Sequence, residues 1–546
     1  MRSTALIADI LKKEGVDFLF CFPVNPLIDA AAEAGIRPIM PCTERTLIGM
    51  ADGYTRVTNG RKLGVCAVQQ GPGVENAFGG VAQAFSDSTP ILCFPGGPPQ
   101  NRWGTPPHFD PVLNYQHISK WVSRINRPER IPEILRRAFT HLKTGRPGPV
   151  ILELPQDVAA AEVKDPIVPY KTIERAKAVA DPEAVRAATK AIIAAKKPLL
   201  HAGLGVLYAE AWDELRELAE LLQIPVMTTL PGKSCFPENH PLALGSGGLS
   251  GPRPVAQYLT ECDLVFGIGS SLSLWIFAAP IPAGKVAVQL TVDERDLNKD
   301  YPIEYPLLGD AKLTLRQMVE EVKRQIGPEG RKGDDRIARE IKARKEAWLG
   351  EWMPKLTSEE VPINPYRVIW DVQKALNSED TIATHDAGSP RDQMAPFWSA
   401  RTPNSYIGWG KSTHLGYSLP LAMGAKVARP EKTVVHIMGD AAFGMSGMEI
   451  AAAARNRIGI LTIILNNSCL GGYDKHIPVA TEKYGTRFIW GDYAKVAEGL
   501  GAYAQRIEKP DEIIPAVSRA LEKTREGKPA LLEMITKEEK ALSKYW

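Results

Sequence analysis

The chain has 546 residues, of which 44% are hydrophobic and 24% are charged. This composition excludes an intrinsically disordered chain, because disordered chains contain too few apolar residues to bury the surface that folding requires. At roughly 150 residues per domain, the length predicts three or four domains. The 66 Lys and Arg residues nearly balance the 63 Asp and Glu residues, so the net charge is only +3 and does not indicate binding to nucleic acid or an anionic membrane. No apolar run reaches the roughly 18 residues that span a bilayer.

The first block of the chain, residues 1–165, alternates short apolar segments with helical patterns. The apolar segments are bounded by Gly, Pro or polar turns, as at Gly145–Pro149. Strands that alternate with helices predict right-handed crossovers and a parallel sheet covered by helices on both faces. We expect strands at Phe18–Phe22, Leu63–Val68, Ile91–Phe94 and Val150–Leu154, and helices at Thr4–Lys13, Thr46–Val57 and Arg130–Leu142.

Two further blocks, residues 181–327 and 360–546, repeat this pattern. The polar stretch Pro166–Ala180 predicts a linker, and the charged stretch Pro328–Lys355 predicts an exposed interdomain helix with few core positions. The sequence therefore predicts an α/β fold of three doubly wound domains with mainly parallel sheets. We expect the strands of these two blocks at Leu199–Ala202, Val226–Thr228, Leu264–Ile268, Val286–Leu290, Thr381–Thr384, Thr433–Met438, Ile460–Leu465 and Ala530–Ile535.

Two polar signals follow neighbouring apolar segments of the third block. Gly439-Asp440 ends one predicted strand, and Asn466-Asn467 ends the next. Because the carboxyl ends of parallel strands meet at one edge of a sheet, we expect Asp440 and Asn467 to lie close together. A carboxylate and an amide oxygen suit Mg²⁺, and the small residues nearby let a diphosphate approach the backbone. Each signal alone is more often an ordinary turn or strand cap, but the two together predict a metal–diphosphate site.

This stretch resembles the GD(x)nNN motif of thiamine diphosphate (ThDP) enzymes, and other motifs extend the resemblance over nearly the whole chain. They include Thr43-Glu44-Arg45 with Met50–Arg56, Gly71-Pro72-Gly73 with Asn76, and Gly416–Pro420. The resemblance is greatest to the acetolactate synthase-like decarboxylases and carboligases. It implies a pyrimidine-binding domain (1–165), a central domain (181–327) and a diphosphate-binding domain (360–546).

The resemblance also implies the residues of a cofactor site. The metal ligands would be Asp440, Asn467 and the backbone carbonyl of Cys469. Leu415 matches the apolar wedge that holds the cofactor bent, and the carbonyl of Thr413 would accept from its 4′-amino group. The remaining residues implied to contact the cofactor are Gly388, Ser389, Gly439, Ala441, Ala442, Leu470 and Gly471.

Glu44 follows a β-like segment at the start of a predicted helix, where a carboxylate is usually a capping residue. The family resemblance implies a catalytic role instead. In ThDP enzymes, the matching glutamate hydrogen-bonds N1′ of the aminopyrimidine and favours the imino tautomer that removes the C2 proton of the thiazolium. A buried carboxylate with a raised pKa suits such a proton relay.

The substrate end of the chain departs from the family pattern. The acetolactate-type Phe-Gln-Glu signature is missing around Phe109, and Pro23–Pro26 replaces the Pro-Gly-Gly or Pro-Gly-Ser of many relatives. These departures put acetolactate itself in doubt but leave the cofactor chemistry untouched. Candidate substrate contacts are Asn25, Gln69, Gln70, His117 and His414, with His108 as a further acid–base candidate.

We therefore expect a Mg²⁺- and ThDP-dependent enzyme that cleaves or forms a C–C bond on a 2-oxo acid or a related carbonyl compound. One alternative is a ThDP- and FAD-dependent 2-oxo acid oxidase, because Gly203-Leu204-Gly205 and Gly267–Ser270 could bind a nucleotide, although such glycines are also ordinary turns. A second alternative is a non-catalytic subunit, which would need none of Glu44, Asp440 and Asn467.

The expected partners are a small carbonyl substrate and further copies of the chain. The resemblance implies a homodimer, or a homotetramer made of two dimers, in which Glu44 of one subunit faces Asp440 of another. No nucleic-acid or membrane partner is expected. Seven scattered cysteines without a CxxC pair favour free thiols in a reducing cytoplasm, and the first residues lack the apolar core of a signal peptide.

Overall fold

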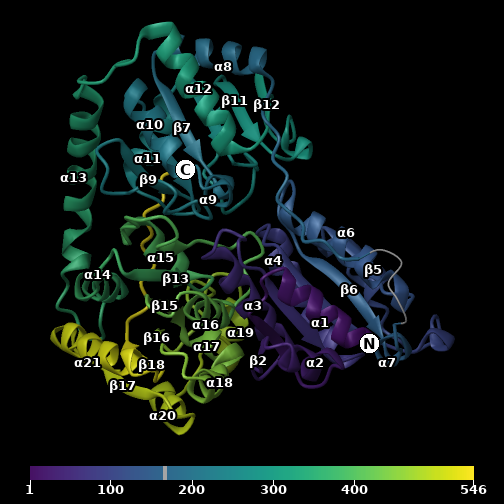
Figure 1. Cartoon of the computed structure of the whole chain (residues 1–546). Helices are drawn as coiled ribbons and strands as arrows, with labels where there is room; N and C mark the ends of the chain where they lie inside the picture. The colour runs from purple at the N-terminus through teal and green to yellow at the C-terminus, as the bar shows by residue number, and fades with distance from the viewer. Residues whose placement is uncertain (164–168) are drawn as a thin grey trace.

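The computed structural model describes residues 1–163 and 169–546, which form three α/β domains with one six-stranded sheet each (Figure 1). Among the described residues, every pairing between neighbouring strands of these sheets is parallel. The predicted fold class is therefore confirmed. The sheets lie within the predicted ranges 1–165, 181–327 and 360–546.

The N-terminal domain has the strand order β2-β1-β3-β4-β6-β5. Its central strands are apolar and buried on both faces, as expected when helices cover both sides of a parallel sheet. Its strands are β1 (Phe18–Phe22), β2 (Arg37–Ile39), β3 (Gly64–Val68), β4 (Ile91–Gly97), β5 (Trp121–Arg124) and β6 (Val150–Pro155). Its helices are α1 (Ser3–Lys13), α2 (Leu27–Glu33), α3 (Glu44–Arg56), α4 (Pro72–Ser86), α5 (Pro111–Asn114), α6 (Ile131–Lys143) and α7 (Gln156–Ala160), with short 3₁₀ turns η1 (Gln100–Arg102), η2 (Gln116–Ile118) and η3 (Pro128–Arg130).

The middle domain has the strand order β12-β11-β10-β7-β8-β9, in which β7 and β10 are the central pair. This is the order 3-2-1-4-5-6 of dinucleotide-binding folds. Its strands are β7 (Pro198–Ala202), β8 (Val226–Thr229), β9 (Ala243–Gly247), β10 (Leu264–Ile268), β11 (Val286–Thr291) and β12 (Tyr305–Leu308). Its helices are α8 (Pro182–Ala194), α9 (Leu204–Ala209), α10 (Trp212–Leu222), α11 (Arg253–Glu261) and α12 (Ala311–Ile326), with the 3₁₀ turn η4 (Glu294–Asp296).

The C-terminal domain has the order β14-β13-β15-β16-β18-β17, which repeats the topology of the N-terminal domain. Its strands are β13 (Thr381–His385), β14 (Tyr406–Ile407), β15 (Thr433–Gly439), β16 (Leu461–Asn466), β17 (Tyr503–Ile507) and β18 (Ala530–Ile535). Its helices are α14 (Pro365–Ala375), α15 (Ser389–Phe397), α16 (Ser418–Ala428), α17 (Asp440–Ser446), α18 (Glu449–Asn456), α19 (Pro478–Tyr484), α20 (Tyr493–Gly499) and α21 (Ile513–Arg525), with the 3₁₀ turn η5 (Pro510–Glu512).

The connections between domains follow the predicted pattern. Residues 166–168 of the predicted linker lie outside the described residues, and 169–180 contain no helix or strand, as expected. The charged segment forms α13 (Arg336–Leu356) at one side of the molecule (Figure 1), preceded by turns. As predicted, α13 has few core positions, but one face does bury Ile341, Trp348, Trp352 and Leu356. Trp352 packs edge-on to Tyr366 of α14, so the helix is part of the domain junction.

The two outer domains meet at a close crossing of α3 and α16. A Cβ atom built on Gly53 would lie 1.9 Å from the carbonyl oxygen of Leu421, and one on Gly424 would lie 1.9 Å from that of Met50. The helix backbones therefore touch, which only glycine permits. The C-terminal segment returns to the middle domain (Figure 1), where Ser543 and Gly251 exchange backbone and side-chain hydrogen bonds.

Candidate active site

The C-terminal domain places the predicted metal ligands at its topological switch point, between β13 and β15, and at the neighbouring end of β16. Asp440 is the first residue of α17, directly after β15. Its carboxylate accepts from the backbone N–H of Ala441 and, across the strand ends, from that of Ser468, both at 2.8 Å. Burial raises the pKa of Asp440 to about 6. Within the described part of the chain no cationic side chain bonds to this buried carboxylate, which therefore suits a bound cation.

Small residues around Asp440 leave room for a diphosphate. A Cβ atom on Gly471 would lie 3.4 Å from Ser389 Oγ and 3.7 Å from Asn467 Nδ2, so these three residues converge. Nothing lies within 4 Å of a Cβ built on Gly388 or Gly439. A carboxylate, an amide and backbone carbonyls are the oxygen donors that Mg²⁺ prefers, so the residues present fit a Mg²⁺–diphosphate group. Among the described residues, no cluster of three or more His, Cys, Asp or Glu side chains offers another metal site.

The segment after β16 contains the other two predicted metal ligands, Asn467 and the carbonyl of Cys469. Asn467 Oδ1 accepts from the backbone N–H of Cys469 at 3.2 Å, which forms a tight turn. The N–H of Leu470 donates to the carbonyl of Arg487 at 2.8 Å, and Ser468 has a φ of 54°. Such a left-handed backbone is unusual for a residue other than glycine and is typical of functional loops.

On the pyrimidine side, Glu44 is the first residue of α3, after the N-cap Thr43. It is only 5% exposed, and its Oε2 accepts from Asn76 Nδ2 at 3.2 Å. A Cβ atom on Gly73 would lie 3.1 Å from Glu44 Oε1, so the turn before α4 packs directly against this carboxylate. Asn76 and Gly73 therefore position Glu44. Both belong to the Gly-Pro-Gly-x-x-Asn motif, which was the sequence signal for this contact.

The N-terminus of α3 lies beside residues of the C-terminal domain of the same chain. Arg45, next to Glu44, contacts His414 Nε2 at 3.1 Å and donates to the carbonyl of Met445 at 3.0 Å. Glu449 of α18 is buried and accepts from the N–H of Cys42 at 3.0 Å and from the Thr46 hydroxyl. Sequence reasoning missed Glu449, because nothing in the sequence links residues so far apart.

The turn that carries Leu415 is held by a buried carboxylate. Asp386 Oδ1 accepts from the N–H of Gly416 at 3.0 Å, and its Oδ2 accepts from that of Ser418 at 2.9 Å. Leu415 is half-buried against the hydrophobic core, and Thr413 has a φ of 54°, which is strained for a β-branched residue. This geometry is compatible with the predicted roles of Leu415 and Thr413. The positioning role of Asp386 follows only from the structure.

The candidate substrate residues lie in different environments. The Asn25 amide donates to the carbonyls of Val68 and Phe94 at 3.0 and 3.1 Å, so it ties strand ends together. Both ring nitrogens of His414 are engaged, Nδ1 by the Gly79 carbonyl and Nε2 by Arg45, and burial together with Arg45 lowers the pKa of His414. His117 is exposed in η2.

Gln69 and Gln70 line a cleft of about 740 Å³ at the carboxyl end of the N-terminal sheet, where β1 and β3 form its switch point. Gln70 Oε1 accepts from Gln156 Nε2 at 3.0 Å. Gly71 and Pro72 line this cleft, and the next residue, Gly73, contacts Glu44. Of the candidate substrate residues, these two therefore lie in open space next to Glu44.

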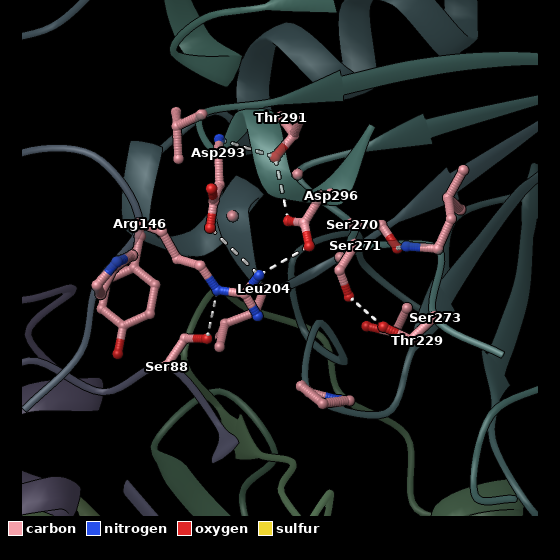
Figure 2. A pocket seen from close by; sticks show the side chains of 18 of the residues that line it. Ser88, Arg146, Leu204, Thr229, Ser270, Ser271, Ser273, Thr291, Asp293 and Asp296 are labelled. Carbon is pink, nitrogen blue, oxygen red and sulfur yellow. Dashed lines mark hydrogen bonds and ion pairs between the residues drawn. The ribbon is translucent and has the colours of Figure 1, made fainter. Parts of the chain in front are cut away.

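A second cavity, of about 930 Å³, lies between the middle domain and its neighbours. It includes the glycine turns after β7 and β10, at the switch point of the middle sheet. Figure 2 shows Arg146 of the N-terminal domain reaching Asp293 and Asp296 of the middle domain in this cavity, while it also bonds to Ser88 of its own domain. Arg146 donates to Asp296 at 2.8 Å, so this ion pair joins two domains.

Comparison with known proteins places all three domains in one family. The family described as "Thiamine pyrophosphate enzyme" matches with its N-terminal TPP binding domain at residues 1–118, its central domain at 185–318 and its C-terminal TPP binding domain at 386–534. The chain therefore belongs to the thiamine pyrophosphate enzymes and is a ThDP-dependent enzyme, as the sequence motifs predicted.

Individual relatives narrow the subgroup to the acetolactate synthase-like enzymes. The probable acetolactate synthase large subunit of Methanocaldococcus jannaschii is 33% identical over 99% of this chain and 93% of its own length. Glyoxylate carboligase of Escherichia coli O157:H7 is 30% identical over 95% of this chain and 90% of its own. The mitochondrial acetolactate synthase catalytic subunit of Saccharomyces cerevisiae is 29% identical over 92% and 77%.

Proposed function

We propose that this enzyme uses Mg²⁺ and ThDP to cleave or form a C–C bond next to the carbonyl of a 2-oxo acid, in the manner of the carboligases it resembles. The observation that carries the proposal is that Asp440, Asn467 and Ser389 lie together at the carboxyl edge of the C-terminal sheet, while Glu44 is held in the N-terminal domain by Asn76. The names of the relatives, which act as carboligases or acetolactate synthases, support the reaction class.

Each residue has a distinct task in this proposal. ThDP, when bound, supplies the electron sink for bond cleavage or formation beside a carbonyl carbon. Asp440, Asn467 and the Cys469 carbonyl would hold Mg²⁺, and Ser389 Oγ would donate to a diphosphate oxygen. Glu44, held by Asn76, would hydrogen-bond the aminopyrimidine ring and transfer a proton to or from it. The buried setting of Glu44 excludes water from that proton.

The metal assignment is tested by replacing Asp440 with alanine. The variant should bind ThDP far more weakly at limiting Mg²⁺, measured by calorimetry, because it loses the only charged ligand. Asp474→Asn is the matched control, since Asp474 pairs with Lys540 at the surface. Wild-type ThDP affinity in Asp440→Ala would disprove the assignment. A panel of 2-oxo acids, assayed for CO₂ release with and without aldehyde acceptors, then tests the reaction itself.

A flavin nucleotide in the middle domain is a second candidate, and the cavity favours it. The dinucleotide-fold strand order and the glycine turns at its switch point support nucleotide binding there. Flavin could be structural, or it could accept electrons in a 2-oxo acid oxidase. A yellow supernatant after denaturation would show the flavin, and oxygen consumption with a 2-oxo acid would indicate the oxidase. A colourless protein would argue against both.

Assembly and location complete the proposal. We expect a homodimer or a dimer of dimers, with the active site shared between subunits as the family resemblance implies. All seven cysteines are free thiols, which supports a cytoplasmic location. Among the described helices, none is both long enough and apolar enough to cross a bilayer.

A further inference from the structure

The cleft of the N-terminal domain has an unusual balance of polar groups. Amides line it at Gln69, Gln70 and Gln156, and its apolar wall consists largely of prolines together with Phe109. Of the described residues that line it, Arg102 is the only Lys or Arg and Glu75 is the only carboxylate. The cleft therefore offers one guanidinium and one carboxylate among otherwise neutral hydrogen-bonding groups.

Arg102 is available for a ligand. Within the described residues its guanidinium lies within 4.0 Å of no carboxylate and donates to no protein acceptor, whereas nearby Arg124 pairs with both Asp110 and Glu153. An arginine that lines a cleft without a partner presents a planar guanidinium, and two of its N–H groups can donate to the two oxygens of a carboxylate.

The turn that carries Arg102 is held in place by contacts on both sides. The N–H of Gln100 donates to Asp157 Oδ2 at 3.0 Å, and the Gln100 side chain donates to the Asn126 carbonyl at 3.0 Å. The Arg124 guanidinium lies over the Trp103 ring, 4.4 Å from its centroid. These contacts fix the backbone of η1, so Arg102 faces the cleft from a defined position.

A second polar group of the cleft also lacks a protein partner. His108 Nε2 is buried, and among the described residues no hydrogen-bond partner reaches it. A buried nitrogen without a partner is costly unless a ligand or water satisfies it. Gly71 and Pro72 also line the cleft and adjoin Gly73, which contacts Glu44. A molecule in the cleft would thus have Arg102 and His108 in its surroundings and would lie near the turn that contacts Glu44.

We propose that Arg102, assisted by His108, binds the carboxylate of a 2-oxo acid in this cleft and so selects an acidic substrate over a neutral aldehyde or a thioester. The inference rests on the proposed function and adds the part of the substrate that the protein recognises. The cationic fork neutralises the carboxylate, the amides of Gln69 and Gln70 can bond to its oxygens or to the ketone, and the apolar wall accommodates a short side chain. Arg102 is a specificity-determining residue in this scheme.

Steady-state kinetics of the holoenzyme with pyruvate and glyoxylate test the proposal. Arg102→Gln should raise KM for both acids about 10- to 100-fold, since a charge-assisted hydrogen bond is lost, while kcat changes little. Arg102→Lys should recover part of this loss, because lysine keeps the positive charge but cannot donate two parallel hydrogen bonds to the carboxylate. KM for acetaldehyde as acceptor should not change. Arg127→Gln is the matched control, as Arg127 is exposed in the same domain but does not line the cleft.

Chemical labelling gives a readout that does not depend on turnover. Phenylglyoxal should modify Arg102 of the holoenzyme, and oxamate, a pyruvate isostere, should protect it, as measured by peptide mass spectrometry. Arg127 should be modified equally with and without oxamate. His108→Gln should weaken the protection of Arg102.

The outcomes separate this inference from the proposed function. If the wild type turns over 2-oxo acids but Arg102→Gln keeps its KM, or oxamate does not protect Arg102, the carboxylate site is refuted and the function stands. If the wild type releases no CO₂ from any 2-oxo acid, the proposed function fails, while oxamate protection still measures the site.

Discussion

Replacing Gly424 by alanine should force apart the two helices that join the outer domains. The new methyl group would lie 1.9 Å from the carbonyl oxygen of Met50, whereas real Cβ contacts are essentially never below 3.0 Å. The helices must therefore separate by about 1 Å, because the contact is with backbone, which cannot rotate away as a side chain could.

The energetic cost follows from two opposing effects. Overpacking in a tight core costs roughly 1–3 kcal/mol, and a contact with backbone belongs at the upper end of that range. Alanine gains about 1 kcal/mol over glycine inside a helix, so the net loss of stability should be about 2 kcal/mol. Because Glu44 is the first residue of α3, a displacement of about 1 Å should also lower turnover by as much as 10²-fold.

Gly350 of α13 provides the matched control. A Cβ atom built on Gly350 has nothing within 4 Å, so the same substitution there should stabilise the protein by about 1 kcal/mol. Urea midpoints and turnover are measured for both variants with saturating ThDP and Mg²⁺. If Gly424→Ala matched the wild type in both, the backbones of α3 and α16 could not be in contact, and the crossing described above would be wrong.

Three further predictions concern Glu44, the assembly and pH. Glu44→Gln should leave ThDP affinity nearly intact but lower turnover ~10²–10⁴-fold, with slower hydrogen–deuterium exchange at C2 of bound ThDP; unchanged exchange would place Glu44 outside the proton relay. Equal mixtures of Glu44→Gln and Asp440→Ala chains should recover about one quarter of wild-type activity after subunit exchange if the site is shared in a dimer. No recovery would make the contact of α3 with its own C-terminal domain the catalytic one. Burial raises the pKa of Glu153 to about 7, above its ordinary 4.5. Its contribution to stability is therefore full below about pH 4.5 and lost as pH rises through 7, so urea unfolding at pH 5 and 8 should show a loss on the order of 2–3 kcal/mol in the wild type that Glu153→Gln lacks. Identical pH dependence in both proteins would refute this.

The candidate site divides clearly between what motifs predict and what they do not. Asp440 and Asn467 were predicted from residue types that suit a metal–diphosphate site at the ends of neighbouring strands, and Glu44 was predicted from the family resemblance alone. Asp386 and Glu449 act through hydrogen bonds to backbone groups that are 30 and 407 residues away in sequence. The role of Arg102 depends on which side chains share its cleft. No local pattern encodes such contacts.

The strands divide in the same way. In each sheet the four predicted strands are the four central ones, because burial on both faces requires the continuous apolar runs that make a strand visible in sequence. The six missed strands, β2, β5, β9, β12, β14 and β17, are all sheet edges. Arg37–Ile39 and Tyr406–Ile407 are only three and two residues long, and Tyr503–Ile507 is mostly half-exposed. An edge strand forms because a neighbouring strand offers it hydrogen bonds, so its place is decided by the assembled sheet rather than by its own residues.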